Sequence, residues 1–257
     1  MKRKRWMILI LILLCGIGIS ASVFLFFRVR YREEELVIHT KEERDVYGHL
    51  FRPRFAGKSC PLVVLGHGYG GSYSDNLDYG SYLASHGIAC YVFDFCGGSE
   101  DSKSSYVEMN LYTEIEDMNG IADYMLTQPW LQTNGLYLAG KSLGGSVAAL
   151  TASERPEDVA GLLLHYPFFV ISDAFKDSGD SIDQYIVPDV FERIAVYEKP
   201  VIIFNGDKDT YVPLEYSEQA AEAYKDARLV VLEGSGHGFK GANRQKVKEE
   251  MTAFILN

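Results

Sequence analysis

The feature that most constrains the fold is a Gly-x-Ser-x-Gly motif formed by Gly140, Ser142 and Gly144. A strand-like apolar run, 135–140, leads into the motif, and a segment of small residues with helical spacing follows it. A serine at the tip of a sharp strand-to-helix turn needs strained backbone angles. Its neighbours must also lack Cβ atoms where strand and helix pass closely. The motif therefore predicts a strand–turn–helix unit with the Ser142 hydroxyl at its tip.

An alternative is a glycine-rich turn in which Ser142 only caps the following helix. A nucleophilic serine requires more of the chain, namely an acid, a histidine and backbone donors for an oxyanion, each after a strand. The start of the helix adds a dipole that favours the negative charge of a tetrahedral intermediate.

Strand-like segments alternate with segments of helical spacing along the rest of the chain. Residues 61–66 form a continuous apolar run, which is typical of a central parallel strand covered on both faces. The alternation predicts the α/β class, with a doubly wound and mostly parallel sheet. Strands are expected at 36–40, 46–52, 61–66, 88–94, 135–140, 159–165, 200–206 and 228–233, and helices at 75–86, 110–127, after Ser142, at 214–225 and at 243–256.

Residues 1–32 have the pattern of a membrane anchor. Four basic residues precede an uncharged run of 22 residues, 6–27, and three more basic residues follow it. As a helix this run would be about 33 Å long, enough to cross a hydrocarbon core of about 30 Å. A cleaved signal peptide fits less well, since the apolar run continues past the small residues 20–22. A lipoprotein signal would need a small residue before Cys15, which Leu14 precedes.

We therefore expect an uncleaved, single-pass signal anchor in the cell membrane, followed by one globular domain over 33–257. The excess of basic residues before the span favours a cytoplasmic N-terminus and an extracytoplasmic domain. Beyond residue 32 the chain has 18 basic and 35 acidic residues, so nucleic acid is not expected as a partner. The three cysteines beyond the span lack Cys-x-x-Cys spacing, and no metal or cofactor is expected.

Candidates for the acid and the histidine follow the last two predicted strands. His237 lies in a glycine-flanked loop after 228–233, and both Asp207 and Asp209 follow 200–206. His237 would take the proton of the serine, and an aspartate would hold its imidazole in the correct tautomer. Asp207 directly follows the glycine that ends the strand, where a carboxylate often caps the turn. The sequence therefore favours Asp209, which lies further along the loop.

A glycine-rich loop around Tyr69 is the candidate oxyanion loop. The oxyanion needs one backbone N–H from the residue after the nucleophile, Leu143, and one from a loop after an earlier strand, here Tyr69. His67 is expected to donate within this loop, and His165 to lie at the edge of the core. We assign no role to Lys141.

Five stretches carry a resemblance to a known family, at residues 67–71, 93–99, 140–145, 206–213 and 236–239. From about residue 45 onward the chain resembles the serine esterase and peptidase group of α/β hydrolases. It is most similar to bacterial cinnamoyl and feruloyl esterases and to serine aminopeptidase-like hydrolases. This resemblance implies the α/β-hydrolase fold, a triad of Ser142, Asp209 and His237, and an oxyanion hole at Tyr69 and Leu143.

The segment 167–199 departs from the pattern of those esterases. It is shorter than the cap that shapes their pocket, and is expected to form only a helix or two over the sheet edge. Such a reduced cap predicts a preference for short or medium acyl esters. Its apolar residues are expected to form one wall of an acyl pocket above Ser142: Phe168, Phe169, Phe175, Tyr185, Ile186 and Phe191.

These patterns together predict a membrane-anchored serine hydrolase that cleaves small-molecule carboxylic esters through an acyl-enzyme. A serine peptidase or amidase with the same triad is the alternative within enzymes. A catalytically silent binding module is the alternative from another class, and the intact set of motifs disfavours it. In a peptidase, acidic residues of the insertion could bind a free amine, although they fit a solvated loop equally well: Asp173, Asp177, Asp180 and Asp183.

Overall fold

The computed structural model describes residues 30–54, 59–98, 102–170 and 187–257. The span expected over 6–27 lies outside these residues. Within the described ranges, no helix has both the length and the apolar character that crossing a bilayer demands.

The described residues form a sheet of eight strands in the order β1-β2-β4-β3-β5-β6-β7-β8. β1 pairs with β2 and β2 with β4 in antiparallel fashion, and all the other neighbours are parallel. The expectation of a mostly parallel sheet is therefore confirmed. The strands are β1 (Tyr31–His39), β2 (Asp45–Pro53), β3 (Cys60–Gly66), β4 (Ala89–Phe93), β5 (Leu131–Lys141), β6 (Gly161–His165), β7 (Val201–Gly206) and β8 (Ala227–Leu232).

The central and edge strands differ in burial as their sequences predict. Every residue of β3 is buried, because helices cover both faces of the sheet there. β1 is an edge strand that begins at Tyr31, so the boundary expected at residue 33 falls inside it. The carboxylates of Glu33, Glu34 and Glu35 are exposed along β1, where charge discourages pairing with another chain.

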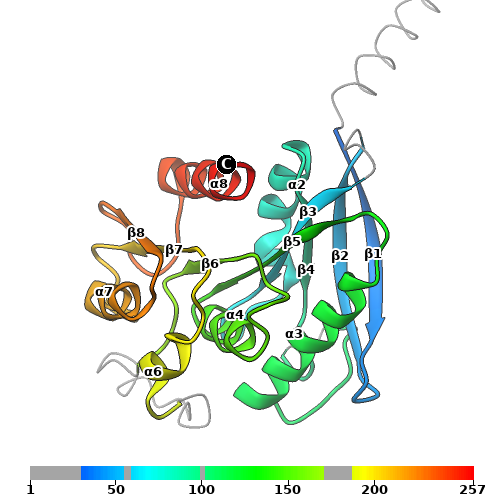
Figure 1. Cartoon of the computed structure of the whole chain (residues 1–257), viewed down its shortest axis with the longest axis horizontal. Helices are drawn as coiled ribbons and strands as arrows, with labels where there is room; N and C mark the ends of the chain where they lie inside the picture. The colour runs from blue at the N-terminus through cyan, green and yellow to red at the C-terminus, as the bar shows by residue number, and fades with distance from the viewer. Residues whose placement is uncertain (1–29, 55–58, 99–101, 171–186) are drawn as a thin grey trace, which may run out of the picture.

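Helices cover the two faces of the sheet in separate layers (Figure 1). α2 and α8 lie together on one face, and α3, α4, α6 and α7 lie on the other. This arrangement places the core on both sides of the parallel strands. The helical elements are the short 3₁₀ turn η1 (Tyr73–Asn76), α2 (Leu77–Ser85), α3 (Leu111–Leu126), α4 (Leu143–Glu154), α6 (Val190–Ile194), α7 (Leu214–Ala223) and α8 (Gly241–Leu256).

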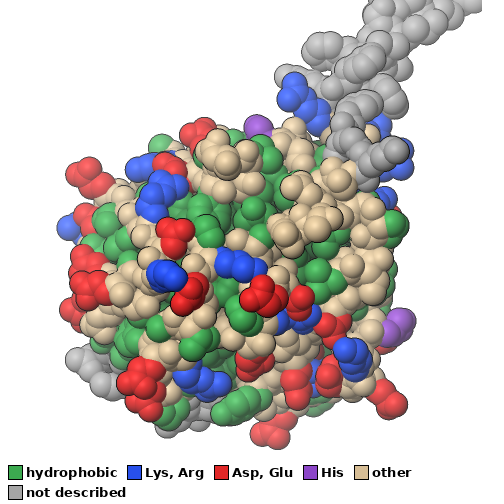
Figure 2. All heavy atoms as spheres, viewed as in Figure 1, with side chains coloured by type: hydrophobic (Ala, Val, Ile, Leu, Met, Phe, Trp, Pro, Cys, Tyr) green, Lys and Arg blue, Asp and Glu red, His purple; other side chains and the backbone are tan. Residues whose placement is uncertain are grey.

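Acidic and basic side chains are interspersed on the surface shown in Figure 2. Ion pairs such as Lys225–Glu198, at 2.6 Å, and Arg228–Glu250, at 2.8 Å, join exposed or half-exposed groups. Pairs of this kind contribute at most about 1 kcal/mol each, so the stability of the fold depends mainly on its buried core.

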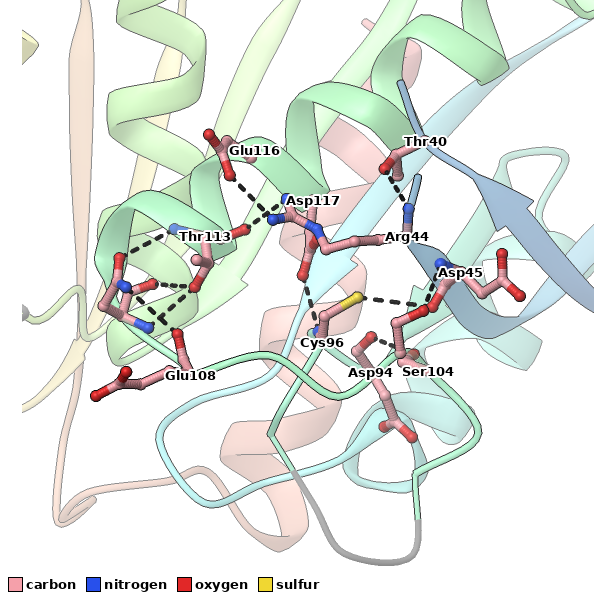
Figure 3. A network of polar contacts seen from close by, with 12 residues as sticks. Thr40, Arg44, Asp45, Asp94, Cys96, Ser104, Glu108, Thr113, Glu116 and Asp117 are labelled. Carbon is pink, nitrogen blue, oxygen red and sulfur yellow. Dashed lines mark hydrogen bonds and ion pairs between the residues drawn. The ribbon is translucent and has the colours of Figure 1, made fainter. Parts of the chain in front are cut away.

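A buried polar network fixes the loop between β4 and α3 (Figure 3). Asp117 of α3 accepts a hydrogen bond from the backbone N–H of Cys96, at 2.8 Å, and pairs with Arg44 Nε at 3.0 Å. Burial raises the pKa of Asp117 to about 6, although both partners favour its ionised form. The same loop donates the backbone N–H of Phe95 to His67 Nε2, at 3.2 Å. The network therefore helps to hold in place the loop after β3, which begins with His67.

Candidate active site

Ser142 lies in the sharp turn between β5 and α4. Its backbone has φ 50° and ψ −119°, which is strained for a residue with a Cβ atom. A Cβ atom on Gly140 would lie 2.0 Å from the carbonyl oxygen of Gly144, and one on Gly144 would lie 2.2 Å from that of His67. Only glycine fits at either position, so the expected strand–turn–helix unit is present with its Gly-x-Ser-x-Gly motif at the crossing.

Ser142, His237 and Asp209 form a continuous hydrogen-bonded chain. Ser142 Oγ lies 3.2 Å from His237 Nε2, and His237 Nδ1 lies 2.9 Å from Asp209 Oδ2. The side chain of Asp209 is fully buried. Its other oxygen accepts the backbone N–H groups of Tyr211 and Val212, both at 2.9 Å. These two bonds fix the carboxylate with one oxygen directed at the imidazole.

Asp207, the other candidate acid, has a different partner. Its Oδ1 accepts the backbone N–H of Gly234 at 2.7 Å and so joins the loop after β7 to the loop after β8. The carboxylate of Asp207 thus holds the loop that carries His237, and the carboxylate of Asp209 contacts the imidazole itself.

The loop after β3 passes directly beside Ser142. A Cβ atom on Gly68 would lie 3.2 Å from the Cβ of Ser142. His67 Nδ1 donates to the carbonyl of Gly68 at 2.8 Å, and its Nε2 accepts a backbone N–H, so the ring is neutral. Burial also lowers the pKa of His67, which favours this neutral form. Tyr69 follows in this loop, and Leu143 begins α4, where a backbone N–H has no acceptor within the helix.

A cavity of about 370 Å³ opens onto Ser142 and His237. Tyr166 and Tyr211 confine the imidazole in it, with ring centroids 4.5 Å and 5.5 Å from that of His237. Tyr166 has φ 38°, a second strained position beside Ser142. The residues that line the cavity are Gly68, Tyr69, Gly71, Asp75, Lys141, Ser142, Tyr166, Tyr211, His237 and Arg244.

Several lining residues were not found from the sequence. Tyr166 directly follows β6, so the rule that active groups follow strand ends could have found it. Lys141, to which we assigned no role, precedes Ser142 and is buried at the cavity. Arg244 lies on α8, and no local pattern connects it with the serine.

The expected acyl-pocket wall differs in the described part of the insertion. Phe168 and Phe169 are buried in the core, and Phe169 packs against Phe191 with ring centroids 6.0 Å apart. None of these three lines the cavity, so the expectation is wrong for them. Phe168 and Phe169 belong to the buried core, and Phe191 is half-buried against it. Phe175, Tyr185 and Ile186 lie outside the described residues, as do the four aspartates proposed to bind an amine.

His165 lies at the end of β6, next to Lys141 in the sheet register. It is fully buried rather than at the edge of the core, among the rings of Tyr79, Phe204 and Phe239. Burial lowers its pKa well below the ordinary value, so this imidazole stays neutral and packs as an aromatic ring.

Two family models match the chain in succession. The model described as serine aminopeptidase, S33, matches residues 57–185, and the model described as TAP-like protein matches residues 184–257. The first match covers both the loop around Tyr69 and the Ser142 turn. The second covers the loops that carry Asp209 and His237.

Individual proteins are similar over most of the chain. An uncharacterised protein of Mycobacterium tuberculosis is 29% identical in an alignment of 218 positions that covers 79% of this chain and 72% of that protein. The structure of Est1E from Butyrivibrio proteoclasticus with bound ferulic acid has a TM-score of 0.74 at 23% identity. The alignment covers 86% of this chain and 100% of the Est1E chain. A dienelactone hydrolase from Anabaena variabilis has a TM-score of 0.68 at 18% identity, covering 88% of this chain and 98% of its own.

Proposed function

Because the chain belongs to the serine aminopeptidase (S33) family of α/β hydrolases, we propose that it cleaves small-molecule carboxylic esters through an acyl-enzyme on Ser142. The observation that carries this proposal is the hydrogen-bonded chain from Ser142 Oγ through His237 to the buried carboxylate of Asp209. A chain of this kind activates a hydroxyl at neutral pH.

In the proposed acylation step, Ser142 Oγ attacks the ester carbonyl while His237 Nε2 takes the hydroxyl proton. The carbonyl oxygen becomes an oxyanion that accepts hydrogen bonds from the backbone N–H groups of Tyr69 and Leu143. The imidazolium, stabilised by Asp209, then gives its proton to the departing alkoxide, and the C–O bond to the alcohol breaks.

In the proposed deacylation step, water takes the place of the alcohol. His237 removes a proton from the water as it attacks the acyl carbon, and the same backbone groups bind the second oxyanion. Collapse of this intermediate breaks the bond to Ser142 Oγ, which regains its proton from His237. The carboxylic acid leaves and the enzyme is restored.

Peptide or amide hydrolysis is the second candidate, because the description of the matched family names an aminopeptidase. An aminopeptidase must bind the free amine of its substrate. Lys141 and Arg244 both line the cavity, and among the described residues Asp75 is the only one with a carboxylate that lines it. This excess of positive charge favours an ester substrate over one with a free ammonium group.

The proposal is tested by labelling the purified protein with a fluorophosphonate and by assaying matched ester and amide substrates. We expect a single modification, at Ser142, and turnover of para-nitrophenyl acetate and butyrate well above that of aminoacyl anilides. Labelling at Ser72 or Ser146 would overturn the assignment of the nucleophile. Faster cleavage of the anilides would favour the peptidase.

We further propose that residues 6–27 anchor the enzyme in the cell membrane, with the hydrolase domain outside the cytoplasm. The support for this is the uncharged run itself and the basic residues on either side of it. The rest of the chain has more acidic than basic residues. Its net negative charge would keep the domain from binding to the anionic membrane surface near which the anchor holds it.

A further inference from the structure

Three cations surround one buried tyrosine ring beside the cavity. Lys141 Nζ and the guanidinium carbon of Arg244 each lie 4.8 Å from the ring centroid of Tyr79, and Lys248 Nζ lies 5.3 Å from it. Lys141 comes from the end of β5, and the other two come from one face of α8. The first two line the cavity that holds Ser142, but Lys248 does not.

The nearby carboxylates do not neutralise all three cations. Asp78 pairs with Arg244 Nη2 through one oxygen, and its other oxygen accepts Arg244 Nε at 2.8 Å and Lys248 Nζ at 2.6 Å. Although burial opposes ionisation, these bonds lower the pKa of Asp78 to about 2. Asp75, the second acid, accepts the backbone N–H of Ser72 at 3.1 Å.

Lys141 is thereby left as a buried ammonium without a carboxylate partner in the described part of the chain. Its only hydrogen bond there goes to the backbone carbonyl of Asp75, at 2.8 Å. The residue is 8% exposed. Burial and the neighbouring guanidinium of Arg244 lower its pKa to about 8. A buried cation of this kind costs free energy unless an anion accompanies it.

Arg244 also retains donors for a ligand. Its Nε and Nη2 bond to Asp78 and to the carbonyl of Asp75, and no described residue accepts from its Nη1. Arg244 and Lys141 both line the cavity that holds Ser142, and their cationic groups differ in geometry, since one is a guanidinium and the other an ammonium. A carboxylate can accept from both at once.

We propose that Lys141 and Arg244 form an anionic subsite, so that the preferred substrates are esters whose acyl or alcohol part carries a free carboxylate. This inference rests on the proposed esterase function and narrows its substrate class. The bound carboxylate supplies the counter-charge that Lys141 lacks, and it holds the ester against Ser142.

The test compares charged and neutral esters of matched size on both sides of the scissile bond. Monomethyl adipate is paired with methyl hexanoate for the acyl side, and para-acetoxybenzoate with para-acetoxybenzamide for the alcohol side. We expect kcat/KM for the charged ester to exceed that of its neutral partner by about 10- to 100-fold in one of the two pairs.

Variants then attribute the preference to the subsite. Arg244→Gln and Lys141→Met should each reduce the ratio of charged to neutral kcat/KM by about 10-fold, and Arg244→Lys should restore part of it. Lys248→Gln is the matched control, since Lys248 shares Asp78 and α8 but does not line the cavity. This control should keep the ratio, and a loss as large as that of Arg244→Gln would overturn the subsite in favour of a general charge effect.

The pH dependence gives a readout that a structural role would not move. Lys141 is charged below its pKa of about 8 and neutral above it, so the ratio should fall as pH rises through 8. The titratable and charged groups that face Lys141 are Tyr79, Asp75, Asp78, Arg244 and Lys248. A change in the catalytic groups affects both esters of a pair alike, so it cancels in the ratio. Suppose that the charged and the neutral ester of each pair have equal kcat/KM at pH 7 while fluorophosphonate still labels Ser142. That result would overturn this inference and leave the esterase proposal intact. Absence of labelling would instead refute the esterase.

Discussion

At the scale of single residues, Asp207 and Asp209 show how two carboxylates in one loop acquire different roles. Asp209 is fully buried, with one oxygen bound by two backbone N–H groups and the other by His237. Asp207 instead accepts a backbone N–H from the neighbouring loop. The difference is one of partners rather than of residue type, so it can be tested by the same substitution at both positions.

Asp209→Asn should lower kcat by about 10⁴-fold, because an amide facing His237 Nδ1 favours the wrong imidazole tautomer. Asp207→Asn should keep most of the activity, since the amide oxygen of asparagine still accepts the N–H of Gly234. Steady-state kinetics on para-nitrophenyl butyrate distinguish the two variants. The opposite order of effects would assign the acid to Asp207.

Because the backbone at Ser142 is strained, Ser142→Ala and Ser142→Gly should lose activity equally but differ in stability. Ser142→Ala and Ser142→Gly should both lower kcat by about 10⁶-fold, because the nucleophile is lost. Glycine adopts φ 50° and ψ −119° without a Cβ clash, so Ser142→Gly should also unfold at a higher temperature than Ser142→Ala. With about 1 kcal/mol of strain released, the difference should be about 2–4 °C by calorimetry. Equal melting temperatures would mean that the turn stores no strain.

At the scale of elements, α3 carries a buried carboxyl, Glu114, for which the described part of the chain shows no cation partner. Glu114 is 2% exposed, and its Oε2 has no hydrogen-bond partner among the described residues. Burial and the neighbouring Asp117 raise the pKa of Glu114 well above its ordinary value. Its folded pKa thus lies above the unfolded one, so the folded state binds a proton that the unfolded state releases. Stability is lost as pH rises from the unfolded pKa to the folded one.

Glu114→Gln should therefore stabilise the protein, and more at pH 8 than at pH 5. The gain grows by about 1.4 kcal/mol for each pH unit that separates the two pKa values. Urea unfolding of both proteins at the two pH values measures it, and titrations elsewhere in the molecule cancel in the difference. Glu116→Gln is the control, because Glu116 is half-exposed and paired with Arg44. A gain for Glu114→Gln that is equal at both pH values would contradict the protonation argument.

At the scale of the whole molecule, the proposed anchor and the hydrolase domain should occupy different compartments. Protease added to intact cells should remove the domain that begins with β1 and leave a fragment from Met1 to about residue 32. Immunoblotting with tags at the two ends of the chain follows both parts. The physical basis is the basic excess before residues 6–27, which favours a cytoplasmic N-terminus. Protection of the domain until the cells are lysed would reverse the topology.

The sequence by itself determined the features that depend on local patterns. Three such features could be predicted because each reflects the backbone requirements of one short segment. They are the glycines at the crossing of β5 and α4, the continuous apolar run in β3 and the glycine-flanked His237. The strand–helix alternation fixed the fold class for the same reason. Most strand ends shifted by a residue or two, but β5 began four residues earlier than expected and β1 five residues earlier. Pairing with β2, rather than composition, decides where β1 starts.

Only the tertiary structure decided what lines the cavity. Arg244 and Asp78 are far apart in the chain, and they meet beside Lys141 because α8 and α2 pack on the same face of the sheet. Phe168 and Phe169 instead belong to the buried core and do not line the cavity. Such contacts depend on how elements pack over long sequence separations, and no local periodicity records that. The excess positive charge beside Ser142 is therefore visible only in the folded chain.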